Sequence, residues 1–141
     1  MKCNAMVFAL LGIASPTVVA DAPCTAATLQ GQYVFTGRGF IEAVEPGIQR
    51  VHYGVFRFDG KGNFSGKQSS SRGGKIGRET LQGTYTLEDD CTGTMSLNSI
   101  LKPGSQLPQT HWDLYVTTDG RHGNIIRMDD GNMAVRSFEK Q

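Results

Sequence analysis

The feature of this chain that most constrains its fold is a series of short segments in which apolar and polar residues alternate. These segments are rich in Val, Ile, Thr, Tyr and Phe, and clusters of Gly, Asp, Asn and Pro separate them, which is typical of strands and turns. No stretch after residue 28 has the periodicity of a helix. The segments that we predict as strands are Leu29–Gly37, Ile48–Asp59, Asn63–Ser69, Ile76–Glu88, Thr92–Ser99, Thr110–Thr118, Asn124–Asp129 and Met133–Glu139.

The turns between these segments predict antiparallel hairpins. Asp59–Gly62, Asp119–Gly120 and Asp130–Asn132 each place Gly or Asn where a tight turn needs a positive φ. Consecutive strands joined by tight turns form a meander, and closing a meander of about eight strands into a barrel removes its exposed edges. The sequence therefore predicts an all-β fold, an antiparallel meander barrel of about eight strands.

The first twenty residues have the organisation of a secretory signal peptide. Lys2 supplies a positive charge, Ala5–Ala14 is an apolar run, and small residues precede a cleavage point after Ala20. The run is too short for a membrane span, and a buried N-terminal helix is the alternative interpretation. We expect residues 1–20 to be a signal peptide and residues 21–141 to be a single barrel domain, secreted or periplasmic.

The expected mature chain contains two cysteines, Cys24 and Cys91. In an exported protein an even number of cysteines predicts a disulfide, and two separate buried thiols are the alternative. A bridge would close a loop of about 66 residues and stabilise the fold by about 4 kcal/mol in the chain-entropy estimate.

The charges of the expected mature chain are balanced. Lys2 is one of 14 basic residues, so 13 remain against 13 acidic residues, and the two signs are interspersed. Binding to nucleic acid needs clustered positive charge, and so does electrostatic attachment to a membrane surface. We therefore expect neither nucleic acid nor membrane as a partner.

Alternation also assigns side chains to faces of the predicted strands. The apolar faces supply a predicted core of Leu29, Tyr33, Phe35, Leu81, Tyr85, Leu87, Met95, Leu97, Trp112, Leu114 and Val116. Two polar residues share these faces: Glu79 lies on the face of Leu81, and His52 on the face of Phe56. A polar group on an apolar face must be paired, lie near a barrel end or line a cavity.

These faces together predict a ligand site. An aromatic pocket with a few polar groups is what a small-molecule site in a barrel needs. The residues that we predict to line it are Tyr33, His52, Phe56, Glu79, Tyr85 and Trp112. Alternatively, the same side chains simply fill the interior, as they do in small barrels.

The order of the motifs resembles that of a known group of proteins. The motifs are Cys24, Leu29-x-Gly31-x-Tyr33, Phe58-Asp59-Gly60-x-Gly62-x-x-x-Gly66, Gly83-Thr84-Tyr85 and Asp90-Cys91-Thr92-Gly93-Thr94. Over this region the chain resembles small secreted bacterial proteins of uncharacterised function, whose strand pattern is similar to calycin-type barrels, including the allene oxide cyclase-like barrel. The resemblance implies a barrel with an internal cavity. It transfers no functional residue, because these motifs are turns and strand spacings rather than chemistry.

Residues suited to metal binding or catalysis form no recognisable motif. His52, His111 and His122 offer three imidazoles, as in some zinc sites, but their spacing has no short metal-binding pattern. The sequence lacks a Gly-x-Ser-x-Gly elbow, and a disulfide would leave no free cysteine in the mature chain. We therefore predict no metal, no cofactor and no catalytic residue.

Three hypotheses about function follow. In the first, the chain is an exported non-enzymatic barrel protein that binds a small apolar or aromatic ligand. In the second, it is a cyclase- or isomerase-type enzyme in which Glu79 or His52 acts as acid or base inside the cavity, which requires burial of that group. In the third, it is a structural or protein-interaction module, which requires a continuous apolar patch on the outer face.

Overall fold

The structure is a computed structural model that describes residues 22–41, 47–101 and 104–141. The predicted signal peptide, residues 1–20, lies outside the described residues. A short 3-10 helix, η1 (Ala26–Thr28), precedes nine strands: β1 (Gln30–Ile41), β2 (Ile48–Asp59), β3 (Asn63–Arg72), β4 (Lys75–Leu87), β5 (Thr92–Leu101), β6 (Ser105–Gln106), β7 (Thr110–Val116), β8 (His122–Arg127) and β9 (Asn132–Lys140). Among the described residues, no helix has the length and apolar character needed to cross a membrane.

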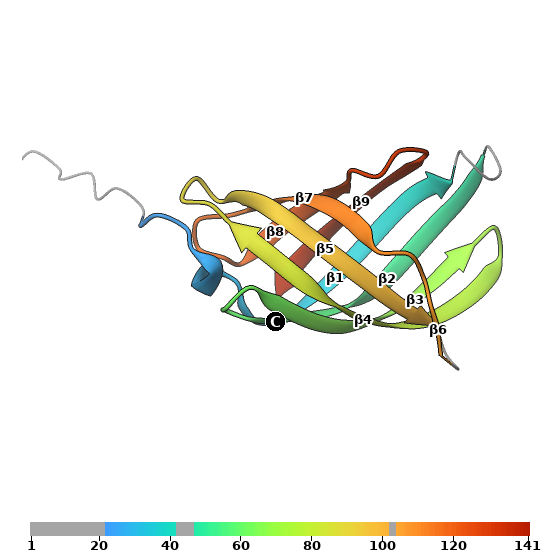
Figure 1. Cartoon of the computed structure of the whole chain (residues 1–141), viewed down its shortest axis with the longest axis horizontal. Helices are drawn as coiled ribbons and strands as arrows, with labels where there is room; N and C mark the ends of the chain where they lie inside the picture. The colour runs from blue at the N-terminus through green and yellow to red at the C-terminus, as the bar shows by residue number, and fades with distance from the viewer. Residues whose placement is uncertain (1–21, 42–46, 102–103) are drawn as a thin grey trace, which may run out of the picture.

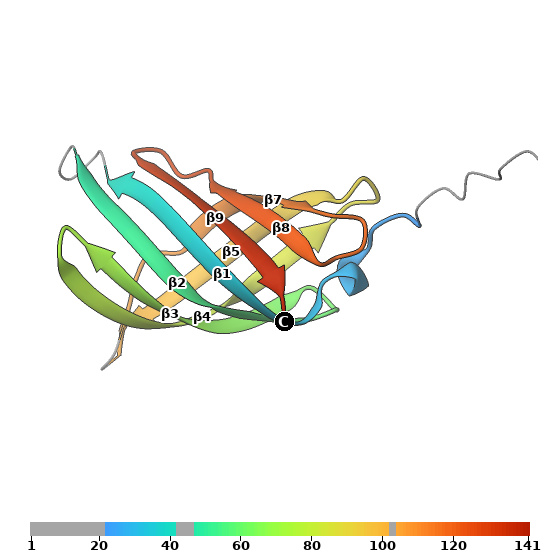
Figure 2. The same ribbon diagram turned by 180° about the vertical axis from the view of Figure 1, so that it is seen from behind.

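Eight of these strands form a closed antiparallel ring (Figures 1 and 2). Within this ring, β1 to β5 pair in chain order, β5 pairs with β7, β7 with β8 and β8 with β9, and β9 returns to pair with β1. The short strand β6 pairs only with the end of β5, at Ile100 and Leu101. The predicted all-β fold and eight-stranded meander barrel are therefore confirmed, and only η1 and β6 lie outside the predicted elements.

The barrel has two ends that differ in construction. We call the end formed by the turns after β2, β4 and β7 the base, and the end formed by the turns after β3 and β8 and by β6 the mouth. In Figure 1 the N-terminal segment with η1 lies at the base, on the left, and β6 lies at the mouth, on the right.

The N-terminal segment closes the base. Cys24 and Cys91 form a disulfide, with 5.1 Å between their Cα atoms, and the Cys24 amide donates a hydrogen bond to the Asp89 carbonyl. The Tyr85 hydroxyl donates to the carbonyl oxygens of Ala26 and Leu29, at 2.7 and 3.0 Å. The predicted disulfide is thus confirmed, and it is compatible with an oxidising, extracellular location.

Aromatic side chains fill the barrel from the base to its middle. The Phe35 and Phe56 rings stack at 4.2 Å between centroids, and Tyr33 meets Phe58 edge-on at 5.3 Å. The predicted core residues are buried, except that Leu87 and Val116 are only partly buried against the core. The interior of the barrel, from the base to its middle, is therefore a packed core. A candidate site has to lie nearer the mouth or on the outer surface.

Candidate functional site at the barrel mouth

A layer of polar side chains lies between the aromatic core and the mouth. It consists of the five buried polar residues in the described part of the chain, each from a different strand: His52 (β2), Gln68 (β3), Glu79 (β4), Ser99 (β5) and Arg136 (β9). Alternation explains their position, because each shares the inward face of its strand with core residues nearer the base, such as Phe56 for His52 and Phe138 for Arg136.

Arg136 is the most unusual member of this layer. Its side chain is 1 % exposed, and its guanidinium carbon lies 4.8 Å from the Trp112 ring centroid and 5.0 Å from that of Phe35. Its Nε and Nη1 atoms are buried and have no hydrogen-bonding partner among the described residues. Burial, assisted by the positive charge of Arg50, lowers the Arg136 pKa to about 9, so the group is still charged at neutral pH.

Gly37 makes room for two of these side chains. It lies between His52 and Arg136 in one cross-strand row, paired with His52 on β2 and with Arg136 on β9. A Cβ atom at Gly37 would come within 2.6 Å of His52 Cδ2 and 2.7 Å of Arg136 Cγ. The absence of a side chain at this position therefore brings the imidazole and the arginine side chain next to each other.

His52 is held as a neutral imidazole. Burial and the positive charges of Arg136 and Arg50 lower its pKa to about 2. Arg50 Nε donates a 3.2 Å hydrogen bond to His52 Nδ1, which assigns the imidazole proton to Nε2. Nε2 is buried and has no partner within the described residues, so its N–H is a second unused donor beside Arg136.

Neutral side chains, rather than arginines, hold the Glu79 carboxylate. Ser70 donates from its hydroxyl to Glu79 Oε1 at 3.1 Å, and Gln68 Nε2 donates to Glu79 Oε2. Gln68 Oε1 is left as a buried acceptor without a partner in the described part of the chain. No described salt bridge joins Glu79 to a guanidinium group, so the charge of Arg136 stays uncompensated by direct contact.

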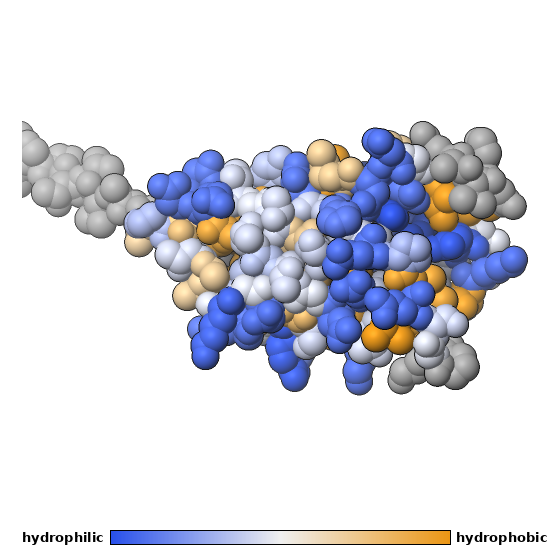
Figure 3. All heavy atoms as spheres, in the orientation of Figure 1, coloured by the Kyte–Doolittle hydropathy of each residue, from blue (hydrophilic) through white to orange (hydrophobic). Residues whose placement is uncertain are grey.

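A pocket of about 200 Å³ opens at the mouth directly above Arg136. Four of its lining residues are arginines, namely Arg50, Arg72, Arg127 and Arg136, and four are apolar, namely Ile41, Leu97, Leu107 and Pro108. The Leu107 amide donates to the Ser99 carbonyl at 2.8 Å, which holds the segment between β6 and β7 beside the pocket. In Figure 3 hydrophobic patches lie among hydrophilic residues at this end of the molecule.

The described lining of the mouth pocket carries an excess of positive charge. Arg127 is neutralised by Asp129, with 2.9 Å between Nε and Oδ2. Glu79 is the acidic group whose charge raises the pKa of both Arg50 and Arg136, against the effect of their burial. The described residues that line the pocket include four arginines and no carboxylate, which favours an anion in this pocket.

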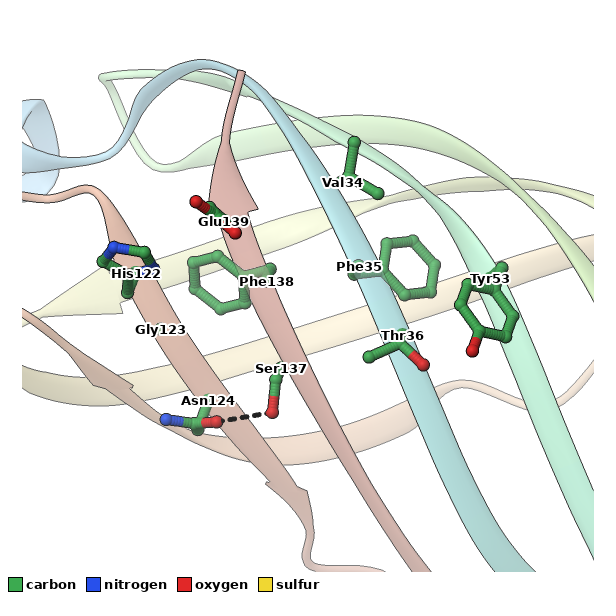
Figure 4. Close-up of a pocket in the computed structure, with 10 residues that line it drawn as sticks. All are labelled: Val34, Phe35, Thr36, Tyr53, His122, Gly123, Asn124, Ser137, Phe138 and Glu139. Carbon is green, nitrogen blue, oxygen red and sulfur yellow. Dashed lines mark hydrogen bonds between the residues drawn. The ribbon is translucent and has the colours of Figure 1, made fainter.

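A second hollow, of about 410 Å³, lies on the outer surface of β8, β9, β1 and β2. Figure 4 shows its lining residues spread along these strands, with Tyr53 at one side and His122 at the other. Its polar groups are exposed, and Ser137 already donates to Asn124 Oδ1 at 2.7 Å. Because none of the described polar side chains that line this hollow is both buried and without a partner, the mouth is the stronger candidate site.

The structure separates the six predicted ligand-binding residues into three groups. Tyr33 and Tyr85 lie near the base, where their hydroxyls donate to backbone carbonyls, that of Tyr33 to Gly120 at 2.7 Å. Phe56 and Trp112 lie in the middle, below Arg136. His52 and Glu79 belong to the polar layer. None of the six is among the described residues that line the mouth pocket.

Sequence reasoning did not select Arg50 and Arg136. A signal for both is nevertheless present in the alternation, because Arg50 shares a face with His52 and Phe56, and Arg136 lies between the inward-facing Ala134 and Phe138.

The three histidines do not converge. His52 is inside the barrel, His111 is exposed with its Nδ1 atom 2.8 Å from Asp129 Oδ1, and His122 is exposed at the base. Within residues 22–41, 47–101 and 104–141, no group of three or more His, Cys, Asp or Glu side chains is arranged to hold a metal ion.

Comparisons with known proteins found structural similarity without a family match. No protein-family model matches the chain, and no curated protein matches it. The crystal structure of Rv2717c from M. tuberculosis is similar over 81 % of this chain and 93 % of that one, with a TM-score of 0.40 and 14 % sequence identity.

Proposed function

We propose that this protein is an exported binding protein that holds a small organic anion in the mouth of its barrel. The observation that carries the proposal is Arg136, a buried and charged guanidinium whose Nε and Nη1 atoms lack partners among the described residues and which lines the pocket. A buried charge without a partner is costly, and an apolar side chain would fill the same space more favourably. A bound anion supplies the missing charge and hydrogen-bond acceptors.

The pocket also indicates the size and character of the ligand. Its volume of about 200 Å³ is below the range of about 300–1,000 Å³ typical of pockets for drug-sized ligands, which favours a compact molecule. Ile41, Leu97 and Leu107 offer an apolar wall beside the arginines. We therefore propose a ligand that is small and partly apolar, as expected from the sequence, and that also carries a negatively charged group. The calycin-like motif order supports the same role, since it implies an internal cavity.

Binding is favoured over acid–base catalysis by the state of His52. The enzyme hypothesis required a buried acid or base, and both His52 and Glu79 are buried. A general base works best with a pKa near the operating pH, whereas burial and neighbouring arginines lower the His52 pKa to about 2. His52 is thus suited to donate a hydrogen bond rather than to exchange a proton.

The test uses the single tryptophan of the chain, Trp112, as a reporter. Because the guanidinium of Arg136 lies 4.8 Å from the Trp112 ring centroid, an anion bound to Arg136 is expected to change the tryptophan fluorescence. We expect saturable titrations with small carboxylates such as hexanoate, and loss of binding in Arg136→Met. Arg78→Met removes an exposed arginine and is the matched control. If neither carboxylates nor inorganic phosphate bind the folded protein, the proposal fails.

A further inference from the structure

The unused hydrogen-bonding groups beside the mouth are mostly donors. The buried atoms without partners in the described part of the chain are His52 Nε2, Arg136 Nε, Arg136 Nη1 and Gln68 Oε1. Since Arg50 donates to His52 Nδ1, the His52 Nε2 atom carries a hydrogen. Three donors therefore stand against one acceptor, and a head group that satisfies this set must be chiefly an acceptor.

The His52 and Arg136 side chains lie at the same level of the barrel, in one cross-strand row with Gly37. Both side chains flank Gly37, and the His52 atom nearest to that glycine is Cδ2, which is bonded to Nε2. His52 Cδ2 and Arg136 Cγ therefore lie on either side of the same inward position. His52 is not among the residues that line the mouth pocket, so a head group that accepts from both residues has to reach below that lining, to the level of Gly37.

We infer that the ligand is a monocarboxylate whose head group is held jointly by Arg136 and His52, with its short apolar body against Leu97 and Leu107. The inference rests on the proposed function and deepens it by naming the ligand class and a second binding residue. A carboxylate offers only acceptors, which matches the excess of donors.

The charge of the head group follows from the partners of the neighbouring arginines. Arg127 is paired with Asp129, and Arg50 uses its Nε on His52 and is less deeply buried than Arg136. Among the described mouth arginines, Arg136 is the fully buried one, and its Nε and Nη1 atoms lack partners. Because Arg50 is only partly buried and Arg72 is exposed, solvent screens their charges, and the one charge that the ligand has to compensate is that of Arg136, which favours a monoanion over a phosphate dianion.

His52 acts in this site as a donor that does not titrate near neutral pH. The charged groups around it are Arg50 on its own strand, Arg72 on β3 and Arg136 on β9, with Glu79 on β4 acting on Arg50 and Arg136. Burial, together with the charges of the three arginines, lowers the pKa of His52 and keeps the imidazole neutral. The affinity for a carboxylate is therefore expected to vary by less than two-fold between pH 5.5 and pH 8.

The experiment is a titration of the full mature protein with acetate, butanoate, hexanoate, octanoate and inorganic phosphate, followed by Trp112 fluorescence. We expect affinity to rise with chain length and then to level off or fall once the pocket of about 200 Å³ is filled, and phosphate to bind at least ten-fold more weakly than hexanoate. His52→Phe should weaken hexanoate binding ten-fold or more. His52→Gln, which keeps a donor, should lose less affinity than His52→Phe, whereas Arg78→Met, at an exposed position outside the site, is the control and should bind like the wild type.

The outcomes separate this inference from the proposed function. If hexanoate binds and Arg136→Met abolishes binding, while His52→Phe and His52→Gln both bind like the wild type, the joint head-group site is wrong and anion binding stands. Phosphate binding as tight as hexanoate overturns the monocarboxylate. A ten-fold gain in affinity on lowering the pH from 8 to 5.5 overturns the neutral donor. Failure of every anion to bind refutes the proposed function itself.

Discussion

At the residue scale, Gly37 decides whether His52 and Arg136 can share the mouth. A Cβ atom there would meet His52 Cδ2 at 2.6 Å and Arg136 Cγ at 2.7 Å, and overpacking of this kind costs about 1–3 kcal/mol. We expect Gly37→Ala to lower the free energy of unfolding by that amount and to weaken carboxylate binding. Chemical denaturation measures the first effect and fluorescence titration the second. Thr36→Ala, at the exposed neighbouring position, should change neither.

A second residue-scale prediction concerns the stability of the protein without Arg136. Burying a charge without a partner is costly, and even a buried ion pair can often be replaced by apolar side chains of similar volume with no loss of stability or with a gain of about 1–4 kcal/mol. We therefore expect Arg136→Met to keep or raise the free energy of unfolding while it abolishes anion binding. A loss of more than about 2 kcal/mol in chemical denaturation would instead identify Arg136 as a structural residue.

At the scale of elements, the N-terminal segment with η1 acts as a plug for the base. It is held by the Cys24–Cys91 bridge, which spans 67 positions, and by the hydrogen bonds of Tyr85. The chain-entropy estimate for a loop of this length is about 4 kcal/mol. We expect the double change Cys24→Ser and Cys91→Ser to lower the free energy of unfolding by roughly this amount.

This prediction has a control at the opposite end of the barrel. The disulfide lies at the base, whereas Arg136 and its pocket lie at the mouth, so the serine variant should bind hexanoate with near wild-type affinity in conditions where it remains folded. Circular dichroism establishes that it is folded. Strong loss of binding in the folded variant would show that the two ends are coupled.

At the scale of the whole molecule, the buried imidazole makes stability depend on pH. The pKa of His52 is about 2 in the folded state and about 6.5 in an unfolded chain. Below pH 6.5 the unfolded chain binds a proton that the folded chain does not, so stability decreases as the pH falls. The slope approaches about 1.4 kcal/mol per pH unit. We expect the free energy of unfolding to drop by about 2 kcal/mol between pH 7 and pH 5.

His52→Gln provides the comparison for this prediction. A glutamine does not titrate, so its variant should lose much less stability over the same interval. Denaturant unfolding at pH 7, 6 and 5 measures both proteins. Parallel curves for the wild type and the variant would contradict the assignment of a buried neutral imidazole at position 52. Below pH 4 the aspartates of the turns, such as Asp59 and Asp119, add a loss in the same direction, because their hydrogen bonds lower their pKa.

The sequence by itself determined the strands, their order and most of the core. Alternation with a period of two is a local property, and glycines such as Gly60 and Gly120, which adopt positive φ, mark the turns directly. The same alternation assigned His52 and Glu79 to the interior correctly. It also carried the information that Arg50 and Arg136 face inward, although nothing in the local pattern distinguishes a buried arginine from one that reaches solvent.

Only the tertiary structure decided which of these side chains meet. Gly37 pairs with His52 on one side and with Arg136 on the other, nearly a hundred residues away, and this row exists only because β9 returns to β1. The same closure assigns Tyr33 and Tyr85 to the base and Arg136 to the mouth. Contacts between distant strands depend on register and barrel shear rather than on local composition. The ends of the barrel, and with them the position of the candidate site, therefore emerge only when the ring is closed.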